Sequence, residues 1–349
     1  MLFFSILGLS SMEFAFGALP TCLAAHTSSY VCSVGCVDGK MGLLIYEDSN
    51  EAKMQAPSVR VAWQKEFKQA VRGVCFHPDG QSVFAITRNR ALCQRDTESG
   101  RKMRCIRMAH RRAPYALHAM SETMLATGDE RGECSIWDWR CSHPRVAHFT
   151  ECADFISDFA SDVDRNILLL TSGDATLTAV DLRTLRPFVQ SPEMHSDLLS
   201  IAIVFEGRRV ACGGATGYLE VFKWNEFDTL VERAKTGHKD TVEDICVVDD
   251  NRIVTASLDG TVRLLNLYPN KMIAVIGVHD DGVEAIDMSY DNRFLLSCGH
   301  DELVKIAPFD SSLYATPKKH LHQRGDTPFT KDEFQNRAFF SELNAIEDE

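Results

Sequence analysis

The sequence lacks the common signatures of a catalytic site. Its 349 residues contain no GxxxxGK[ST] phosphate loop, no GxSxG nucleophile turn and no HExxH zinc motif. His-Asp neighbours do occur, but each stands within a repeated segment described below, where a structural role accounts for it. We therefore expect a protein that is not an enzyme, with no catalytic residue, no cofactor and no small-molecule substrate.

Positive charge is scarce, since 37 Lys and Arg stand against 49 Asp and Glu, for a formal net charge of −12. An acidic surface repels phosphate backbones, which argues against direct binding of nucleic acid. Apart from the N-terminal stretch, no segment of 18 or more residues is dominantly apolar. A membrane span is therefore not expected.

The twelve cysteines include no CxxC pair, and the sequence has no Asn-x-Ser/Thr sequon. Several lie in apolar runs, Cys75, Cys212 and Cys298 among them. This distribution predicts reduced, buried thiols of an intracellular protein rather than a disulfide framework. Cys32 and Cys36 stand four apart without a second pair, so we expect no metal site.

The N-terminal stretch is apolar, yet it has no Lys or Arg before Lys40. A secretory signal needs a basic first region, and Glu13 interrupts the apolar run. The favoured interpretation is an extension or doubtful start over residues 1–11, followed by a folded domain over 12–310. A cleaved signal on a secreted protein is the remote alternative.

What the sequence does contain is one pattern repeated seven times: a β-like run, a tight polar turn and a second β-like run. IVTASLDGTVRLLNL at 253–267 and LLSCGHDELVKIAPF at 295–309 are two copies. The first spacing between turn positions is 51 residues and the other five are 42 or 43, a period typical of propeller blades. The extra residues of the first spacing fit the polar segment between Glu47 and Ser58. The turn positions are Asp38, Asn89, Arg131, Asp174, Thr216, Asp259 and Asp301.

A second landmark shares this period, because four histidines stand 21 or 22 residues before a turn position. They are His110, His195, His238 and His279. Further β-like runs, such as the one at 71–76 that leads into the HPDG turn, raise the content to about four short strands per copy. The pattern therefore predicts an all-β fold, a seven-bladed β-propeller.

A repeat of this length with a His, a turn Asp and a terminal Trp-Asp resembles the WD40-repeat family, whose members form β-propellers. The resemblance implies a hydrogen-bonded network in each blade that links the turn Asp to the His and continues through a strand Ser or Thr to the Trp. Most copies carry an apolar residue in place of the Trp, as at Leu265, so the propeller is divergent. The residues assigned to this network are His110, His195, His238, His279, Asp38, Asp174, Asp259, Asp301 and Ser257.

Apolar residues alternate in front of the first copy, at Phe14, Phe16 and Ala18. WD40 rings usually close by pairing an N-terminal strand with the last blade, which covers a sheet edge. We therefore expect this stretch to supply the outer strand of blade seven. Deletion of residues 12–20 should then lower the melting temperature sharply.

Within the WD40 family, the chain resembles one subfamily from about residue 21 to 345. The most specific segments are RRVACGGATGYLEVFKWNEF at 208–227 and NRFLLSCGHDELVKI at 292–306. The resemblance implies a non-catalytic scaffold of the nucleus and nucleolus, with the cytoplasm as a further location. It also implies a part in ribosomal RNA synthesis or processing, with ribosome-assembly factors as partners.

The stretch LATGDERGECSIWDWR ends in the only Trp-Asp pair of the chain, Trp137-Asp138, and in Arg140. It resembles the WDxR box by which some WD40 proteins bind the damaged-DNA-binding adaptor of cullin-4 ubiquitin ligases. The resemblance implies that Asp138 and Arg140 form a polar docking pair. It gives an alternative function, that of a substrate receptor of such a ligase.

The competing interpretation of this box is purely structural, with Trp137 in the blade core and Arg140 as an exposed loop charge. Arg131 stands where both the box and the blade network have an acidic turn residue. An incomplete blade network does not by itself account for the Trp-Asp pair. The sequence therefore favours, without settling it, a role for Arg140 in contact with a partner protein.

Residues 311–349 are expected to form a flexible tail with a short amphipathic helix, because Thr330 and Glu333 make a capping box. A helix this short is marginal in water on its own. It therefore either packs against the ring or binds in a groove of a partner, and we favour the partner. The residues assigned to this contact are Phe339, Phe340 and Leu343.

Overall fold

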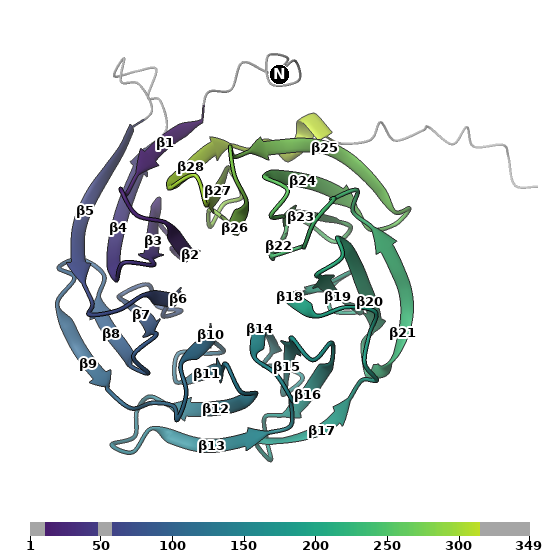
Figure 1. The fold of residues 1–349 in the computed structure, drawn as a ribbon, viewed down its shortest axis with the longest axis horizontal. Coiled ribbons are helices and arrows are strands. Elements are labelled where there is room, and N and C mark those ends of the chain that lie inside the picture. Colours follow the sequence, from purple (N-terminus) through teal and green to yellow (C-terminus); the bar gives the residue numbers. More distant parts are fainter. Residues whose placement is uncertain (1–10, 48–57, 315–349) are drawn as a thin grey trace, which may run out of the picture. The chain divides into compact units, whose positions relative to one another are not determined.

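The computed structural model describes residues 11–47 and 58–314. Seven four-stranded antiparallel sheets are arranged around a central axis (Figure 1). The prediction of an all-β, seven-bladed propeller is therefore confirmed. Each predicted turn position lies in the connection between the second and third strands of its blade.

The first four blades take their strands in chain order. Blade one holds β2 (Pro20–Ala25), β3 (Val31–Cys36), β4 (Lys40–Glu47) and β5 (Ser58–Glu66). Blade two holds β6 (Val71–Phe76), β7 (Ser82–Thr87), β8 (Leu92–Asp96) and β9 (Lys102–Ile106). Blade three holds β10 (Pro114–Ala119), β11 (Met124–Asp129), β12 (Glu133–Asp138) and β13 (Arg145–Thr150). Blade four holds β14 (Ile156–Asp162), β15 (Ile167–Ser172), β16 (Leu177–Asp181) and β17 (Arg186–Gln190).

Blades five to seven complete the ring, and a short 3-10 helix, η2 (Ser311–Tyr314), follows the last strand. Blade five holds β18 (Leu198–Val204), β19 (Arg209–Gly214), β20 (Tyr218–Lys223) and β21 (Glu226–Lys235). Blade six holds β22 (Asp244–Val247), β23 (Arg252–Ala256), β24 (Thr261–Asn266) and β25 (Lys271–Val278). Blade seven holds β26 (Val283–Met288), β27 (Phe294–Gly299), β28 (Leu303–Pro308) and β1 (Met12–Ala15).

The ring closes as the N-terminal alternation predicts. β1 pairs antiparallel with β28, and Phe14 lies opposite Val304. Phe16 and Ala18 are buried in the cluster that joins blades one and seven. The outer strand of blade seven thus comes from the start of the folded domain, and it covers the edge of β28.

Burial follows position within the blade. The second strands contact the neighbouring blades on both faces, so β7, β15 and β27 are buried at every residue. This explains why they are nearly continuous apolar runs in the sequence. The outer strands β13 and β17 alternate between more and less exposed residues, because one face packs inward and the other meets solvent. The core is therefore a series of apolar layers between blades.

Three carboxylates of the innermost strands link neighbouring blades, a contact that no pattern in the sequence indicates. Each accepts a hydrogen bond from a backbone N–H of the next blade: Ile201 to Asp158 at 3.0 Å, Ile286 to Asp244 at 2.9 Å and Ala25 to Asp287 at 2.7 Å. Burial raises the pKa of these carboxyl groups, to about 7 at Asp158, about 8 at Asp244 and about 6 at Asp287.

The cysteines differ from the expectation at one place. Cys93 and Cys105 form a disulfide, so the prediction of reduced thiols throughout is wrong for this pair. They lie directly opposite each other on β8 and β9, a relation that strand register creates and sequence spacing does not show. The other ten cysteines are free, and most of them are buried.

Candidate functional site

Blade three contains a chain of four polar residues that leads inward from the Trp-Asp pair. The indole of Trp137 donates to the Thr127 hydroxyl at 2.7 Å, and the His110 ring contacts the same hydroxyl at 2.6 Å. The other ring nitrogen of His110 lies 3.6 Å from a carboxylate oxygen of Asp129. All four residues are buried, so they fix the blade from within.

The acidic member of this network is therefore Asp129, two residues before the predicted turn position. Arg131 itself is exposed, and its N–H donates to Asp129 at 2.9 Å. Burial raises the pKa of Asp129, but the nearby His110 ring and hydrogen bonds from two backbone N–H groups outweigh this effect and lower it. The sequence-based inference that blade three lacks its acidic residue is wrong, and Trp137 is explained by its blade.

Blade six shows a similar network without the Trp. His238 lies 3.2 Å from the carboxylate of Asp259 and 2.9 Å from the hydroxyl of Thr255. Leu265 fills the place of the Trp and is fully buried, so the polar chain ends at Thr255. The strand hydroxyl is that of Thr255 and not Ser257. Ser257 instead accepts the Asp259 N–H at 3.1 Å within the turn.

In blade seven, His279 and Asp301 are joined at 2.8 Å, and His279 also contacts the Ser297 hydroxyl at 2.8 Å. Burial lowers the pKa of both His238 and His279. Burial by itself raises the pKa of Asp259, yet hydrogen bonds, the first of them from Thr261, lower it to about 2. The His and Asp side chains of each pair therefore contact each other inside the blades.

The structure does not bring the remaining predicted network residues into such chains. His195 is 57% exposed, and its ring lies 3.4 Å from Glu220 rather than beside a turn carboxylate. Asp174 accepts the Ala153 N–H and the Thr176 hydroxyl. Asp38 caps its own turn and pairs with Lys40 at 2.7 Å. Within residues 11–47 and 58–314 no histidine contacts either aspartate, because these two copies have a different residue at the His position.

The second half of the WDxR box forms an ordered pair at the surface. Arg140 donates from Nε to one carboxylate oxygen of Asp138 at 2.9 Å and from Nη2 to the other at 2.6 Å. The side chain of Arg140 is nevertheless 70% exposed. The hydrogen bonds from Arg140 lower the pKa of Asp138 to about 2. The box thus presents an oriented guanidinium to solvent.

The same arrangement recurs in blade four, where the sequence has no Trp. Arg183 donates to Asp181 at 3.1 and 2.8 Å, and its side chain is 73% exposed. Both arginines follow the third strand of their blade. Because successive strands are antiparallel, all connections from first to second and from third to fourth strand lie at one end of the ring. We call this end the lower rim; it includes residues 26–30, 77–81, 96–101, 138–144 and 181–186.

Trp139 anchors the WDxR loop to the neighbouring blade, a role that no pattern in the sequence indicates. Its indole donates to Gln94 of β8 at 2.6 Å, and its ring meets that of Phe84 edge-on with centroids 5.0 Å apart. Arg104 lies over the same ring at 4.7 Å and donates to the Trp139 carbonyl at 2.8 Å. Arg140 therefore projects from a loop with fixed contacts to blade two.

The remaining assigned contacts, Phe339, Phe340 and Leu343, lie outside the described residues, as does the helix expected around them. No helix among residues 11–47 and 58–314 is long and apolar enough to cross a membrane.

Comparison with known proteins extends over nearly the whole propeller. The WDR55 family model matches residues 12–309. WD repeat-containing protein 55 of Arabidopsis thaliana is 32% identical over 298 residues, which cover 84% of this chain and 82% of the relative. The protein of the same name from Homo sapiens is 30% identical over 285 residues, covering 81% and 72%. WD repeat-containing protein JIP5 of Coprinopsis cinerea is 29% identical over 293 residues, covering 80% and 70%.

Proposed function

The chain belongs to the WDR55 family, and from this we propose that it is a non-catalytic WD40 scaffold of the nucleus and nucleolus that acts in ribosome production. A scaffold of this kind binds other proteins on its rims. The observation that carries the proposal is the family match over residues 12–309, together with the resemblance of the segments at 208–227 and 292–306. Ribosome-assembly factors are the proposed partners.

The positions of the paired histidines and aspartates support a scaffold rather than an enzyme. The residue pairs that suggest acid–base chemistry, His279 with Asp301 and His238 with Asp259, are buried and bonded to each other. Groups engaged in this way are not available to a substrate. Partner recognition is therefore assigned to exposed groups of the rims, of which Arg140 and Arg183 are oriented examples.

Imaging and RNA labelling test the nucleolar role. A C-terminally tagged chain should concentrate in the nucleolus, and its depletion should slow the maturation of pulse-labelled ribosomal RNA precursors. Affinity purification followed by mass spectrometry should then recover ribosome-assembly factors. Exclusion of the tagged chain from the nucleus would contradict this proposal, and accumulation in the secretory pathway would support the alternative of a secreted propeller.

A second candidate function is that of a substrate receptor of a cullin-4 ubiquitin ligase. The observation that favours it is the repetition of one geometry on adjacent blades, because Asp138–Arg140 and Asp181–Arg183 both hold an exposed guanidinium on the lower rim. Planar guanidinium groups suit bidentate contacts with carboxylates of a partner protein. Both functions can belong to one scaffold.

Pull-down of the purified ligase adaptor tests this candidate. We expect the wild-type chain to retain the adaptor, and Arg140→Ala to retain much less. Arg183→Ala separates the contributions of the two blades, and Arg208→Ala, an exposed arginine of blade five, is the matched control. Equal recovery of the adaptor by the wild type, Arg140→Ala and the double Arg140→Ala, Arg183→Ala variant would exclude docking through this rim geometry.

A further inference from the structure

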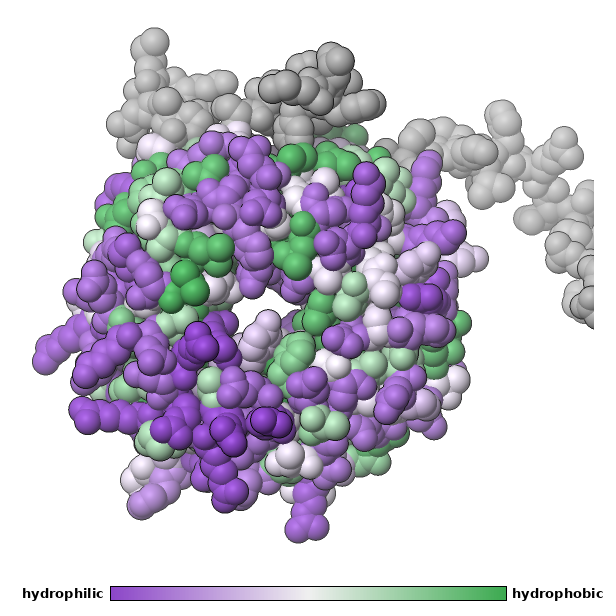
Figure 2. Space-filling view, in the orientation of Figure 1, coloured by the Kyte–Doolittle hydropathy of each residue, from purple (hydrophilic) through white to green (hydrophobic). Residues whose placement is uncertain are grey.

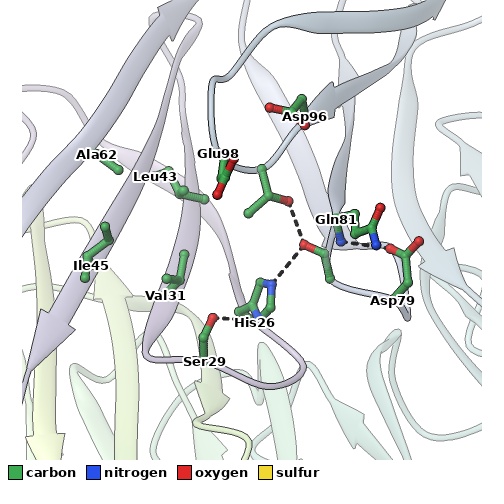
Figure 3. Close-up of a pocket in the computed structure, with 12 residues that line it drawn as sticks. His26, Ser29, Val31, Leu43, Ile45, Ala62, Asp79, Gln81, Asp96 and Glu98 are labelled. Atoms are coloured by element: carbon green, nitrogen blue, oxygen red, sulfur yellow. Dashed lines mark hydrogen bonds between the residues drawn. The ribbon is translucent and has the colours of Figure 1, made fainter.

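A cavity of about 570 Å³ lies between blades one and two. One wall consists of strands β3, β4 and β5 of blade one, and the other consists of two turns of blade two, residues 77–81 and 96–100 (Figure 3). Both turns belong to the lower rim. The volume falls in the range of pockets that hold small ligands or a few side chains.

Two aromatic residues of blade one hold these turns in place. The His26 ring contacts the Gly80 carbonyl at 2.9 Å, and the Trp63 indole donates to the Thr97 carbonyl at 2.8 Å. Gly80 and Gly100 both have positive φ, and a Cβ at either position would stand 2.5 or 2.6 Å from the His26 or Trp63 ring. The two turns therefore pack against these rings as closely as only glycine allows. This packing sets the position of the cavity wall that blade two contributes.

The two walls of the cavity differ in chemistry. Blade one contributes an aliphatic surface formed by Val31, Leu43, Ile45 and Ala62. Blade two contributes three carboxylates, at Asp79, Asp96 and Glu98, and no Lys or Arg is among the residues that line the cavity. An aliphatic wall that faces carboxylates matches a side chain with an apolar stem and a cationic end.

Glu98 is the carboxylate best placed to receive such a group. Asp79 and Asp96 already accept backbone N–H groups of their own turns, from Gln81 and Ser99. Glu98 has no ion pair or hydrogen bond with any residue in the described part of the chain. Figure 3 shows its side chain beside Leu43, directed into the cavity. A cation could therefore bind the Glu98 carboxylate without breaking any contact within the described part of the chain.

We propose that this cavity binds a short segment of a partner protein in which an Arg or Lys is flanked by aliphatic residues. The stem of the basic side chain lies on Leu43 and Ile45, and its charged end reaches Glu98 and Asp96. The net charge of −12 draws a basic segment toward the ring. The proposal is independent of adaptor docking, because Arg140 offers a positive group and the cavity offers negative ones.

Fluorescence anisotropy with a labelled Ala-Leu-Arg-Leu-Ala peptide and the full chain tests the proposal. Two further peptides serve as controls, one with Glu in place of Arg and one with Ala in place of both Leu. We expect the first peptide to bind, and both control peptides to bind at least about tenfold more weakly, since each lacks one half of the match. Equal binding of the peptide without Leu would overturn the proposal, because non-specific attraction to an acidic protein would explain it.

Variants of the cavity complete the test. Glu98→Gln should weaken binding of the basic peptide about tenfold, and Ala62→Tyr, at an exposed position of β5, should block the aliphatic wall. Glu206→Gln removes an exposed carboxylate of blade five on the same rim and should leave binding unchanged. Thermal melts check that the variants are folded. Absence of binding by the wild type, or equal affinities of Glu98→Gln and Glu206→Gln, would exclude this site.

Discussion

The Asp287 carboxylate on blade seven accepts the Ala25 N–H of blade one at 2.7 Å, across the point where the ring closes. The two residues are separated by 262 positions in the chain. The pairs Asp158–Ile201 and Asp244–Ile286 repeat the relation elsewhere in the ring. Hydrogen bonds from backbone N–H groups to buried carboxyl groups thus supplement the apolar layers that hold neighbouring blades together.

These carboxyl groups predict that stability falls as the pH rises. Burial raises the pKa of Asp158 to about 7 and that of Asp244 to about 8. The folded chain therefore keeps protons that the unfolded chain releases above about pH 4, and the free energy of unfolding decreases up to about pH 8. His238 and His279, whose pKa burial lowers, act in the opposite direction below about pH 6.5.

Between about pH 7 and 8 the histidines are mostly neutral in both states, and the buried thiols, whose pKa burial raises, are mostly protonated in both states. The carboxyl groups therefore dominate the pH dependence of stability in this window. We expect the melting temperature of the wild type to fall by a few degrees across it, and that of Asp244→Asn to change less. Asp228→Asn, on the surface of blade five, is the control and should keep the wild-type slope. Parallel slopes for all three proteins, measured by differential scanning fluorimetry, would contradict the assignment.

The blade networks predict that the same Thr→Val substitution lowers the free energy of unfolding by different amounts in blades three and six. Thr127 serves both His110 and Trp137, whereas Thr255 serves His238 alone, because Leu265 replaces the Trp in blade six. Thr127→Val leaves two buried polar groups without a partner, at a cost of about 2–4 kcal/mol. Thr255→Val leaves one, at about 1–2 kcal/mol.

Urea denaturation of both valine variants measures this difference. Valine keeps the shape of threonine, and both hydroxyl groups are fully buried, so the comparison isolates the number of hydrogen-bond partners. Thr127→Val should show the lower transition midpoint of the two. A lower midpoint for Thr255→Val would show that the indole contact adds nothing to blade three.

The ring itself could be predicted from sequence because its signals are periodic. The turn positions, the four strands per blade and the closing strand at Phe14 follow from spacing and alternation, and all of them agree with the structure. The insertion between Glu47 and Ser58 also falls between two strands, as its polar composition predicts. Repetition averages out local ambiguity, which explains this success.

Individual side-chain contacts were harder to predict. They depend on the length and direction of each side chain, and the position of a residue in the repeat does not determine these. Asp129 contacts His110 from two positions before the turn position, which a fixed spacing rule assigns to Arg131. Likewise Thr255 replaces Ser257 as the strand hydroxyl. The cross-blade carboxylate of Asp287 and the Glu98 cavity depend on pairs of blades, and no single repeat carries a signal for them.

The exposed Asp138–Arg140 pair of the WDxR box predicts that substitution of Arg140 does not change the stability of the fold. Arg140 is at the surface, so Arg140→Ala should leave the melting temperature and the circular dichroism spectrum unchanged. Trp139→Ala, in contrast, removes contacts with Gln94 and Phe84 and should lower the melting temperature by several degrees. If Arg140→Ala were equally destabilising, a loss of adaptor binding by that variant would reflect unfolding of the loop.

Ring closure by β1 predicts that the start of the folded domain is needed for stability. A chain that begins at Phe16 lacks β1 and leaves the β28 edge uncovered, with Val304 and Ile306 without their cross-strand neighbours. We expect its melting temperature to fall by about 10 °C or more and its tendency to self-associate to rise, because an open edge can pair with another copy. A chain that begins at Ser11 keeps β1 and is the matched control. Scanning fluorimetry and size-exclusion chromatography measure both effects, and equal melting temperatures for the two chains would show that blade seven is stable with three strands.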